Sequence, residues 1–196
     1  SRMTVNKALN NLSAEGLIER KPGKGTFVCA KRVSKPTDCA RSFTEDMKAI
    51  GLVAGAKLIS YEVIRAHDKP EIAQRLELSD DELLHYFVRL RTGNDKPIAI
   101  SYTYVSTKIV PAIDIDCLER SFYAFLDSQG IEREYQGTFY TAKLPTVEQQ
   151  RLLETNDIAL LCAEHSTFTR REGKLIPFGY TLTCYNGDLY TYFSSI

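Results

Sequence analysis

The 196-residue sequence predicts an α+β protein in which an antiparallel sheet carries helices on one face, preceded by a short segment of different character. Three observations predict this class. Runs of alternating apolar residues recur through the chain. Several of these runs are joined in pairs by turns rich in glycine, asparagine and aspartate, which is typical of antiparallel hairpins. Short stretches with helical apolar spacing lie between the runs.

Charge is distributed unevenly along a chain whose net charge is zero. Lys and Arg together number 25, as do Asp and Glu. Residues 1–35 hold eight of the basic residues and two of the acidic ones, a net of +6. The remainder, with 17 basic and 23 acidic residues, carries −6. A basic segment joined to an acidic body indicates a polyanion-binding part on a domain with another task.

The first 28 residues predict a helix followed by a β-hairpin. One apolar stripe at helical spacing faces away from a polar side, and Gly16 ends the helix. Two short β-like runs then flank the basic turn at 22–25. Residues 31–41 lack periodicity. We therefore expect one unit over 1–30, a linker over 31–41 and a second unit over 42–196. The stripe consists of Val5, Ala8, Leu9 and Leu12.

The second unit predicts seven strands and four short helices. Helices are expected where a capping residue precedes helical spacing, as Ser121 and Thr146 do. The turns 93–96, 171–174 and 186–188 join strands as hairpins, which makes the pairing antiparallel. The expected helices span 43–50, 70–76, 122–128 and 146–154. The expected strands span 57–66, 84–92, 98–105, 132–143, 160–169, 175–185 and 189–193.

Several classes of protein are excluded by what the sequence lacks. No apolar run approaches the roughly 20 residues that a membrane helix needs, and the opening residues do not form a signal peptide. Five scattered cysteines without a CxxC pair argue against a zinc site or disulfides and favour the cytoplasm. The three histidines are isolated, and no phosphate-binding glycine loop, nucleophile elbow or dinucleotide fingerprint occurs. We expect no metal, no cofactor and no catalytic residue.

Arg89 and Arg91 are the main candidates for a binding site. They are separated by two residues in an expected strand, so both leave the same face of the sheet. Two neighbouring guanidinium groups need an anion, and phosphate satisfies them bidentately. Ser121, as a helix cap, adds backbone N–H groups at a positive helix end. The alternative is that the arginines pair with surface carboxylates and that Ser121 is only a cap.

Ordered motifs give the chain a resemblance to a known family. SRMTV at 1–5 and GKGTFV at 23–28 resemble the recognition helix and wing of the winged helix-turn-helix in GntR-family bacterial transcription regulators. SFTEDM at 42–47, RLR at 89–91, SFY at 121–123 and CYNGDLY at 184–190 resemble the UTRA effector domain of the HutC subfamily. The resemblance implies a chorismate-lyase-like fold for the second unit. It also implies that full-length members carry further residues ahead of position 1, including the helices that position the recognition helix.

For the first unit, the resemblance implies contacts with operator DNA. A helix with an apolar face and a polar face can present side chains to base edges, while basic residues reach phosphates. The family often has arginine where this chain has Asn6, so an operator preference does not carry over. The alternative is a solvated amphipathic helix with a charged hairpin. The candidate DNA-binding residues are Arg2, Thr4, Asn6, Lys7 and Lys24.

For the second unit, the resemblance implies a phosphate site at Thr44, Arg89, Arg91, Ser121 and Tyr123. Relatives that sense N-acetylglucosamine-6-phosphate have glutamates where this chain has Ser101 and Gly179, so the sugar end differs. Aromatic and hydroxyl side chains are candidates there, among them Tyr102 and Tyr180, although a sheet tyrosine is as often core. The candidate effector-binding residues are Ser42, Phe43, Thr44, Arg89, Arg91, Ser101, Ser121, Tyr123, Thr183 and Tyr185.

The resulting functional prediction is a cytoplasmic transcription regulator, not an enzyme. We expect a repressor of a sugar uptake or catabolic operon that acts as a homodimer, with no membrane association. Its partners would be operator DNA and a small phosphorylated effector that alters DNA binding. Two alternatives stay open. The domain could sense a phosphonate, an amino acid or a urocanate-like acid, or the chain could be an enzyme of chorismate-lyase-like fold that acts on an anionic substrate.

Overall fold

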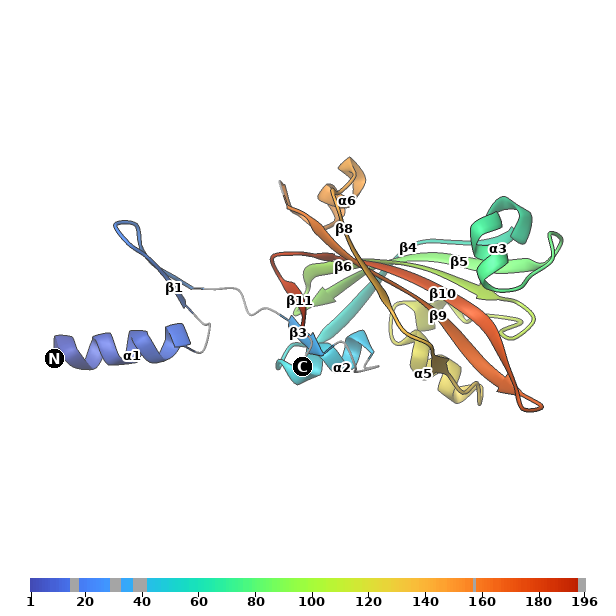
Figure 1. Ribbon diagram of the computed structural model, residues 1–196, viewed down its shortest axis with the longest axis horizontal. Helices are drawn as coiled ribbons and strands as arrows, with labels where there is room; N and C mark the ends of the chain where they lie inside the picture. Colours follow the sequence, from blue (N-terminus) through green and yellow to red (C-terminus); the bar gives the residue numbers. More distant parts are fainter. Residues whose placement is uncertain (15–17, 29–32, 37–41, 157, 194–196) are drawn as a thin grey trace.

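The computed structural model describes residues 1–14, 18–28, 33–36, 42–156 and 158–193. Its first part is the helix α1 (Arg2–Ala14) followed by the antiparallel hairpin of β1 (Ile18–Lys21) and β2 (Gly25–Val28). In Figure 1 this part lies at one end of the molecule, apart from the large sheet. The helix and hairpin expected from the sequence are both present, with the turn between the strands at 22–24.

The large sheet has seven strands, and its pairing is antiparallel throughout. The order is β4-β5-β6-β10-β9-β7, and β8 also pairs with β9. The expected α+β class with an antiparallel sheet is therefore confirmed. The strands are β4 (Ala54–Arg65), β5 (Leu83–Gly93), β6 (Lys96–Ser106), β7 (Glu134–Tyr135), β8 (Phe139–Lys143), β9 (Leu160–Arg171) and β10 (Lys174–Asn186).

Helices cover both faces of this sheet, whereas the sequence analysis placed them on one. Alternation along β5 explains the difference: Phe87 faces one side and packs with α5, while Leu84 faces the other and packs with α3. Figure 1 shows α3 and α6 above the sheet and α5 below it. The helices are α3 (Pro70–Arg75), α4 (Ile115–Leu118), α5 (Phe122–Ser128) and α6 (Val147–Leu152), with a 3₁₀ turn at Ala66–Asp68.

The segment expected to be a linker over 31–41 contains a strand, which corrects that expectation for residues 33–36. β3 (Val33–Pro36) pairs in parallel with β11 (Tyr190–Phe193), near the other end of the chain. Val33 is buried there and packs with Met47 of α2 (Phe43–Ala49). The pairing joins residues that are far apart in sequence, so the local pattern of either segment does not reveal it.

The strand expected over 132–143 is divided into β7 and β8, both paired with β9. Glu134 lies opposite Phe168, while Phe139 lies opposite Glu164, so the register shifts by one residue between them. Gly137 lies in this interval with a φ of +104°, a conformation that side-chain-bearing residues rarely adopt. The bulge turns β8 so that it closes one side of the cavity described next.

Candidate functional site

A cavity of about 360 Å³ opens on one face of the sheet, between α2, α5 and the segment around β8. The structure brings all ten candidate effector-binding residues to its walls: Ser42, Phe43, Thr44, Arg89, Arg91, Ser101, Ser121, Tyr123, Thr183 and Tyr185. They come from four separate parts of the chain, namely the start of α2, β5 with β6, the start of α5, and β10.

The floor of the cavity is a grid set by strand register. Arg89 on β5 lies opposite Ser101 on β6, which lies opposite Thr183 on β10 and then Ala163 on β9. Side chains two residues along each strand point to the same face, so the neighbouring row contains Thr103, Thr181 and His165. The floor is therefore cationic on β5 and covered by small side chains over β6 and β10.

The two arginines are buried in this cavity, and no carboxylate among the described residues pairs with them. Arg89 and Arg91 are 5% and 8% exposed, and Nε and Nη1 of Arg89 and Nε of Arg91 have no hydrogen-bond partner within the described part of the chain. Burial, followed by repulsion from Arg91, lowers the pKa of Arg89 to about 9, and burial lowers that of Arg91 to about 10. Both remain cationic near pH 7. Buried charge without a partner is costly, so the chemistry of this site favours a bound anion.

Aromatic rings support the two guanidinium groups from the side. The Arg91 guanidinium lies 4.5 Å from the ring centre of Phe43, and that of Arg89 lies 5.3 Å from Phe87 and 5.9 Å from Phe122. Contacts of this kind fix the position of a guanidinium group and leave its N–H donors for another partner. The alternative that these arginines pair with surface carboxylates is inconsistent with their burial.

Serine residues cap the two helices at the cavity; the sequence predicted this role for Ser121 but not for Ser42. The Ser121 hydroxyl accepts from the Ala124 N–H at 3.2 Å and begins α5. Ser42 forms a capping box with Glu45 and begins α2. Each serine thereby sets where the next side chains point, Tyr123 on α5 and Thr44 on α2, and both line the cavity.

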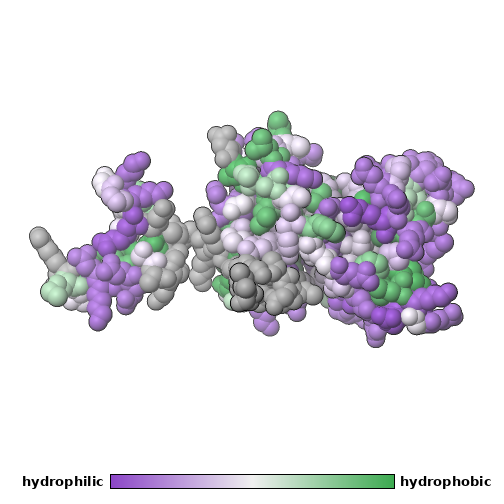
Figure 2. All heavy atoms as spheres, in the orientation of Figure 1, coloured by the Kyte–Doolittle hydropathy of each residue, from purple (hydrophilic) through white to green (hydrophobic). Residues whose placement is uncertain are grey.

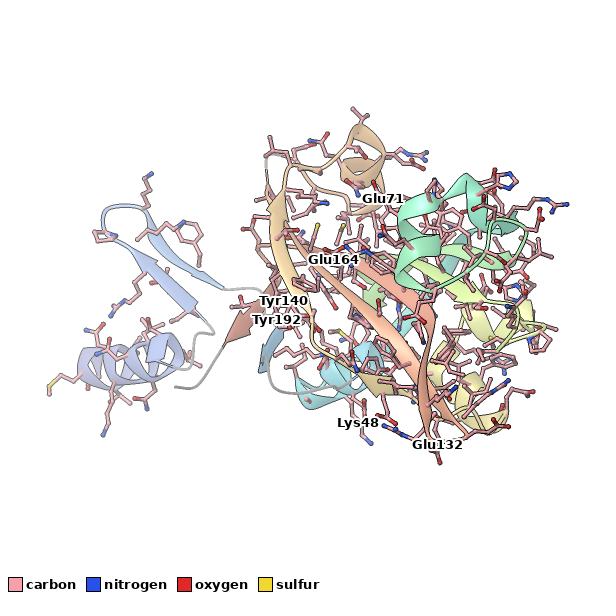
Figure 3. All side chains as sticks on the ribbon, turned by 45° about the vertical axis from the view of Figure 1, so that its right-hand side comes forward. Lys48, Glu71, Glu132, Tyr140, Glu164 and Tyr192 are labelled. Atoms are coloured by element: carbon pink, nitrogen blue, oxygen red, sulfur yellow. The ribbon has the colours of Figure 1, made fainter. Side chains whose placement is uncertain are left out.

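Several cavity residues were missed by sequence reasoning. They lie on β3, β6, β7, β9, β10 and β11, at the start of α5 and over residues 137–140. His165 looks isolated in the sequence, but it alternates with Ala163 along β9, so both side chains lie on one face of that strand. In Figure 3, Tyr140 and Tyr192 lie side by side, with ring centres 4.3 Å apart. The lining residues outside the predicted set are Lys35, Thr103, Phe122, Tyr135, Gly137, Thr138, Tyr140, Ala163, His165, Thr181 and Tyr192.

Two tyrosines proposed for the sugar end lie on the wrong face. Tyr102 alternates with Ser101 and points to the opposite side of the sheet, where its hydroxyl accepts from Gln149 at 3.1 Å. Tyr180 alternates with Thr181 in the same way and donates to the Glu164 carboxylate. Period-two alternation excludes both from a cavity that their neighbours line.

A buried polar contact joins the cavity wall to β3 and β11. The carboxylate of Asp46, on α2, is 1% exposed and lies 3.1 Å from the Lys35 ammonium of β3. The same carboxylate accepts a hydrogen bond from the Tyr190 hydroxyl of β11 at 2.7 Å. Asp46 thus ties together three elements, one of which follows the N-terminal hairpin in the chain.

The candidate DNA-binding residues lie on the N-terminal part. Thr4, Asn6 and Lys7 are exposed on α1, and Lys24 is exposed in the β1–β2 turn; Arg2 is the first residue of α1. Arg20 of β1 donates to the side-chain oxygens of Asn10 at 2.8 Å and Asn6 at 3.3 Å. These hydrogen bonds hold the hairpin against the polar face of the helix.

Among the described residues that line the cavity, three are basic side chains and none is a carboxylate. A sheet that holds an anion-receiving cavity, connected to a helix and basic hairpin, defines a ligand-sensing domain attached to part of a DNA-binding unit. Comparison with known proteins finds one family model in each of these two parts of the chain. The UTRA domain model matches residues 49–191, and the model of bacterial regulatory proteins of the gntR family matches residues 1–28. The chain belongs to the GntR family of bacterial transcription regulators and carries a UTRA domain.

Individual relatives support this assignment. The chain is 31% identical to the HTH-type transcriptional repressor NagR of Bacillus subtilis, over 98% of this chain and 78% of the relative. It is 26% identical to the mannosyl-D-glycerate transport/metabolism system repressor MngR of Escherichia coli, over 98% and 79%. The structure of PhnF from Mycobacterium smegmatis has the same fold, with a TM-score of 0.79 at 23% identity over all of this chain and 85% of that one.

Proposed function

We propose that this protein represses a sugar uptake or catabolic operon and that a phosphorylated sugar, bound in the cavity, alters its affinity for operator DNA. The observation that carries the proposal is the pair of buried arginines, because their unpartnered N–H groups face a cavity with no carboxylate among its described lining residues. A phosphate monoester supplies two negative charges and enough acceptor oxygens for both guanidinium groups. The relative MngR is described as a repressor of a mannosyl-D-glycerate transport/metabolism system, which is consistent with sugar-related control.

The ten lining residues predicted from the sequence are proposed to bind the effector in two groups. Arg89, Arg91, Ser121, Tyr123 and Thr44 would surround the phosphate. Ser42, Phe43, Ser101, Thr183 and Tyr185 would contact the rest of the molecule. Within the part of the chain that the structure describes, no helix is long and apolar enough to cross a membrane. The proposed place of action is the cytoplasm, where operator DNA is found.

Binding of DNA is proposed for the exposed residues of α1 and the hairpin turn. Thr4, Asn6 and Lys7 would face the major groove, and Lys24 would contact the backbone; Arg2 is proposed with them from the sequence alone. Release of Asn6 from Arg20 would be part of that contact. Effector binding would act through α2, since Phe43 and Thr44 line the cavity and Asp46 of the same helix contacts β3.

A homodimer is proposed, with a contact at the face of β8 and α6. Phe139, Leu144 and Val147 are 68%, 85% and 83% exposed, respectively. Figure 2 shows hydrophobic side chains gathered over these two elements. Exposed apolar patches of this kind mark interaction surfaces, and regulators that bind two half-sites need two copies.

A thermal-shift screen tests the proposed effector class. Phosphorylated sugars are compared with the same sugars without phosphate, and with a phosphonate, an amino acid and urocanate. A ligand at 100 times its dissociation constant stabilises the folded protein by ~2.7 kcal/mol. Stabilisation by phosphorylated sugars alone supports the proposal. Stabilisation by one of the other acids alone supports that acid as effector instead, and turnover of any ligand would reopen the prediction that the protein is not an enzyme.

A further inference from the structure

The β9 side of the cavity, three strands from Arg89, contains an imidazole that contacts the proposed phosphate site only through the Tyr123 hydroxyl. His165 lies on β9, whereas Arg89 lies on β5, with β6 and β10 between them. At ~4.8 Å per strand spacing, the two backbones are about 14 Å apart. The floor between them consists of Ser101, Thr103, Thr181 and Thr183, whose small side chains leave room for a ligand.

Two tyrosines hold the His165 ring in place. Its Nε2 lies 3.4 Å from the Tyr123 hydroxyl, and Tyr135 packs edge-on with ring centres 5.4 Å apart. Burial, followed by the charge of Lys35, lowers the pKa of His165 to about 4, so the ring is neutral near pH 7. A neutral imidazole accepts through one nitrogen and donates through the other. When Nε2 accepts from Tyr123, Nδ1 is the donor, and it has no hydrogen-bond partner within the described residues.

His85 shows what a purely structural histidine looks like in the same sheet. Its Nδ1 lies 2.8 Å from the Tyr61 hydroxyl and its Nε2 lies 2.9 Å from the Val110 carbonyl oxygen, so both ring nitrogens are used. It is 3% exposed and does not line the cavity. His165 differs from His85 because only its Nε2 has a hydrogen-bond contact among the described residues, at 3.4 Å, and because its side chain lines the cavity.

We propose that His165 is a specificity-determining residue that hydrogen-bonds a hydroxyl or carbonyl group on the uncharged end of a phosphorylated ligand. This inference rests on the proposed function, since it assumes that the phosphate lies at Arg89 and Arg91. Hydroxyl-bearing floor residues suit a polyhydroxylated ligand. A cationic substituent would have no compensating carboxylate among the described lining residues, so the ligand class is a neutral sugar phosphate rather than an amino-sugar phosphate.

Calorimetric titration of residues 1–196 tests the assignment. The ligands are inorganic phosphate and the 6-phosphates of glucose, fructose, mannose and galactose. The variants are His165→Ala, His165→Leu, Arg89→Ala and the control His67→Ala, whose imidazole is exposed. We expect His165→Ala to weaken binding of the tightest sugar phosphate about tenfold. Binding of inorganic phosphate should weaken much less, since His165 contacts the phosphate site only through Tyr123. Arg89→Ala should lower the affinity for both ligands, and His67→Ala should change the affinity for neither. His165→Leu keeps most of the side-chain volume and carries the same expectation if the alanine variant does not fold.

Failure of this inference is distinct from failure of the proposed function. The inference is overturned if the His165 variants bind inorganic phosphate and the sugar phosphate with equally reduced affinity, or if they bind both with unchanged affinity. In either case His165 does not contact the sugar. The inference is also overturned if no sugar phosphate binds more tightly than inorganic phosphate. The proposed function itself fails if Arg89→Ala changes the affinity for no ligand, or if the unmodified protein binds neither phosphate nor any sugar phosphate.

Discussion

At the scale of single residues, the cavity is defined by charges that the fold buries and does not neutralise. Arg89 and Arg91 share one strand face, and aromatic rings rather than carboxylates surround them. Such an arrangement destabilises the ligand-free protein, and a bound anion would stabilise the folded state by neutralising the two charges. An anion that neutralises the two arginines removes this destabilisation, and the free energy so released contributes to its binding affinity.

Replacing one arginine should therefore stabilise the ligand-free protein. Arg89→Met removes a buried charge and the repulsion with Arg91 while keeping most of the side-chain volume. We expect the free energy of unfolding to rise by about 1–2 kcal/mol without ligand. Urea denaturation measures this difference. A clear loss of stability would show that Arg89 has a neutralising partner and would weaken the case for an anion site.

The neutral state of His165 makes stability depend on pH. Its folded pKa of about 4 lies below the ordinary value of 6.5, so between these values the unfolded chain binds more protons than the folded one. Stability should consequently rise with pH from about 4 to 6.5 and then level off. His85 is also buried and its pKa is lowered too, so it contributes in the same direction. Denaturation of His165→Gln across this range should show a smaller slope, and an unchanged slope would contradict the burial of a neutral imidazole.

At the scale of elements, α2 contacts both the cavity and the strand that follows the N-terminal hairpin in the chain. Its first residues line the cavity, while Asp46 in its middle contacts β3 and β11. β3 follows the N-terminal hairpin in the chain, so a shift of α2 on ligand binding would be felt there. The strength of this connection depends on a single buried carboxylate.

Removing that carboxylate should cost more than removing one of its partners. Asp46→Ala leaves the Lys35 ammonium and the Tyr190 hydroxyl without their shared acceptor, and we expect a loss of roughly 2–4 kcal/mol. Tyr190→Phe removes one hydrogen bond and should cost about 1–2 kcal/mol. Thermal or urea unfolding of both variants measures the two losses. Equal, small losses would mean that Asp46 does not tie the three elements together.

Sequence patterns predicted those helices and strand faces that depend on neighbouring residues alone. The α5 helix follows from its Ser121 cap, and the shared face of Arg89 and Arg91 follows from the two-residue period. The pairing of β3 with β11 was not predictable, because it joins segments more than 150 residues apart. The exclusion of Tyr102 from the cavity was available from its alternation with Ser101. To predict that His165 lies in the cavity, one needs the order of the strands as well as the face of β9 on which its side chain lies.

At the scale of the whole molecule, the proposed homodimer would bring two DNA-binding units onto one operator. The exposed residues of β8 and α6 are the proposed contact between copies. Leu144→Glu places a charge in this patch, and we expect it to shift the protein from dimer to monomer in sedimentation at tens of micromolar. The control Val53→Glu changes a residue that is 75% exposed outside the patch and should leave the dimer intact. A monomeric unmodified protein would refute the proposal.

Operator binding by the full-length regulator should fall steeply with salt, because basic residues of α1 and the hairpin would replace counterions. Lys24→Ala removes one phosphate contact per subunit, so in a dimer the slope of log affinity against log salt should decrease in magnitude by about 2. The control Lys174→Ala, at the first residue of β10 and outside the N-terminal part, should not change this slope. A flat salt dependence of the unmodified protein would argue against the proposed DNA contacts.

The most direct test of the central claim is calorimetric titration of inorganic phosphate and a sugar phosphate into the unmodified protein, Arg89→Ala and Arg91→Ala. Charged hydrogen bonds contribute ~1.5–3 kcal/mol each, so each variant should bind both ligands roughly tenfold to a hundredfold more weakly. The variants should still fold and, in the full-length regulator, still bind DNA without responding to the effector. Unchanged affinity in both variants would show that the buried arginines do not hold the effector.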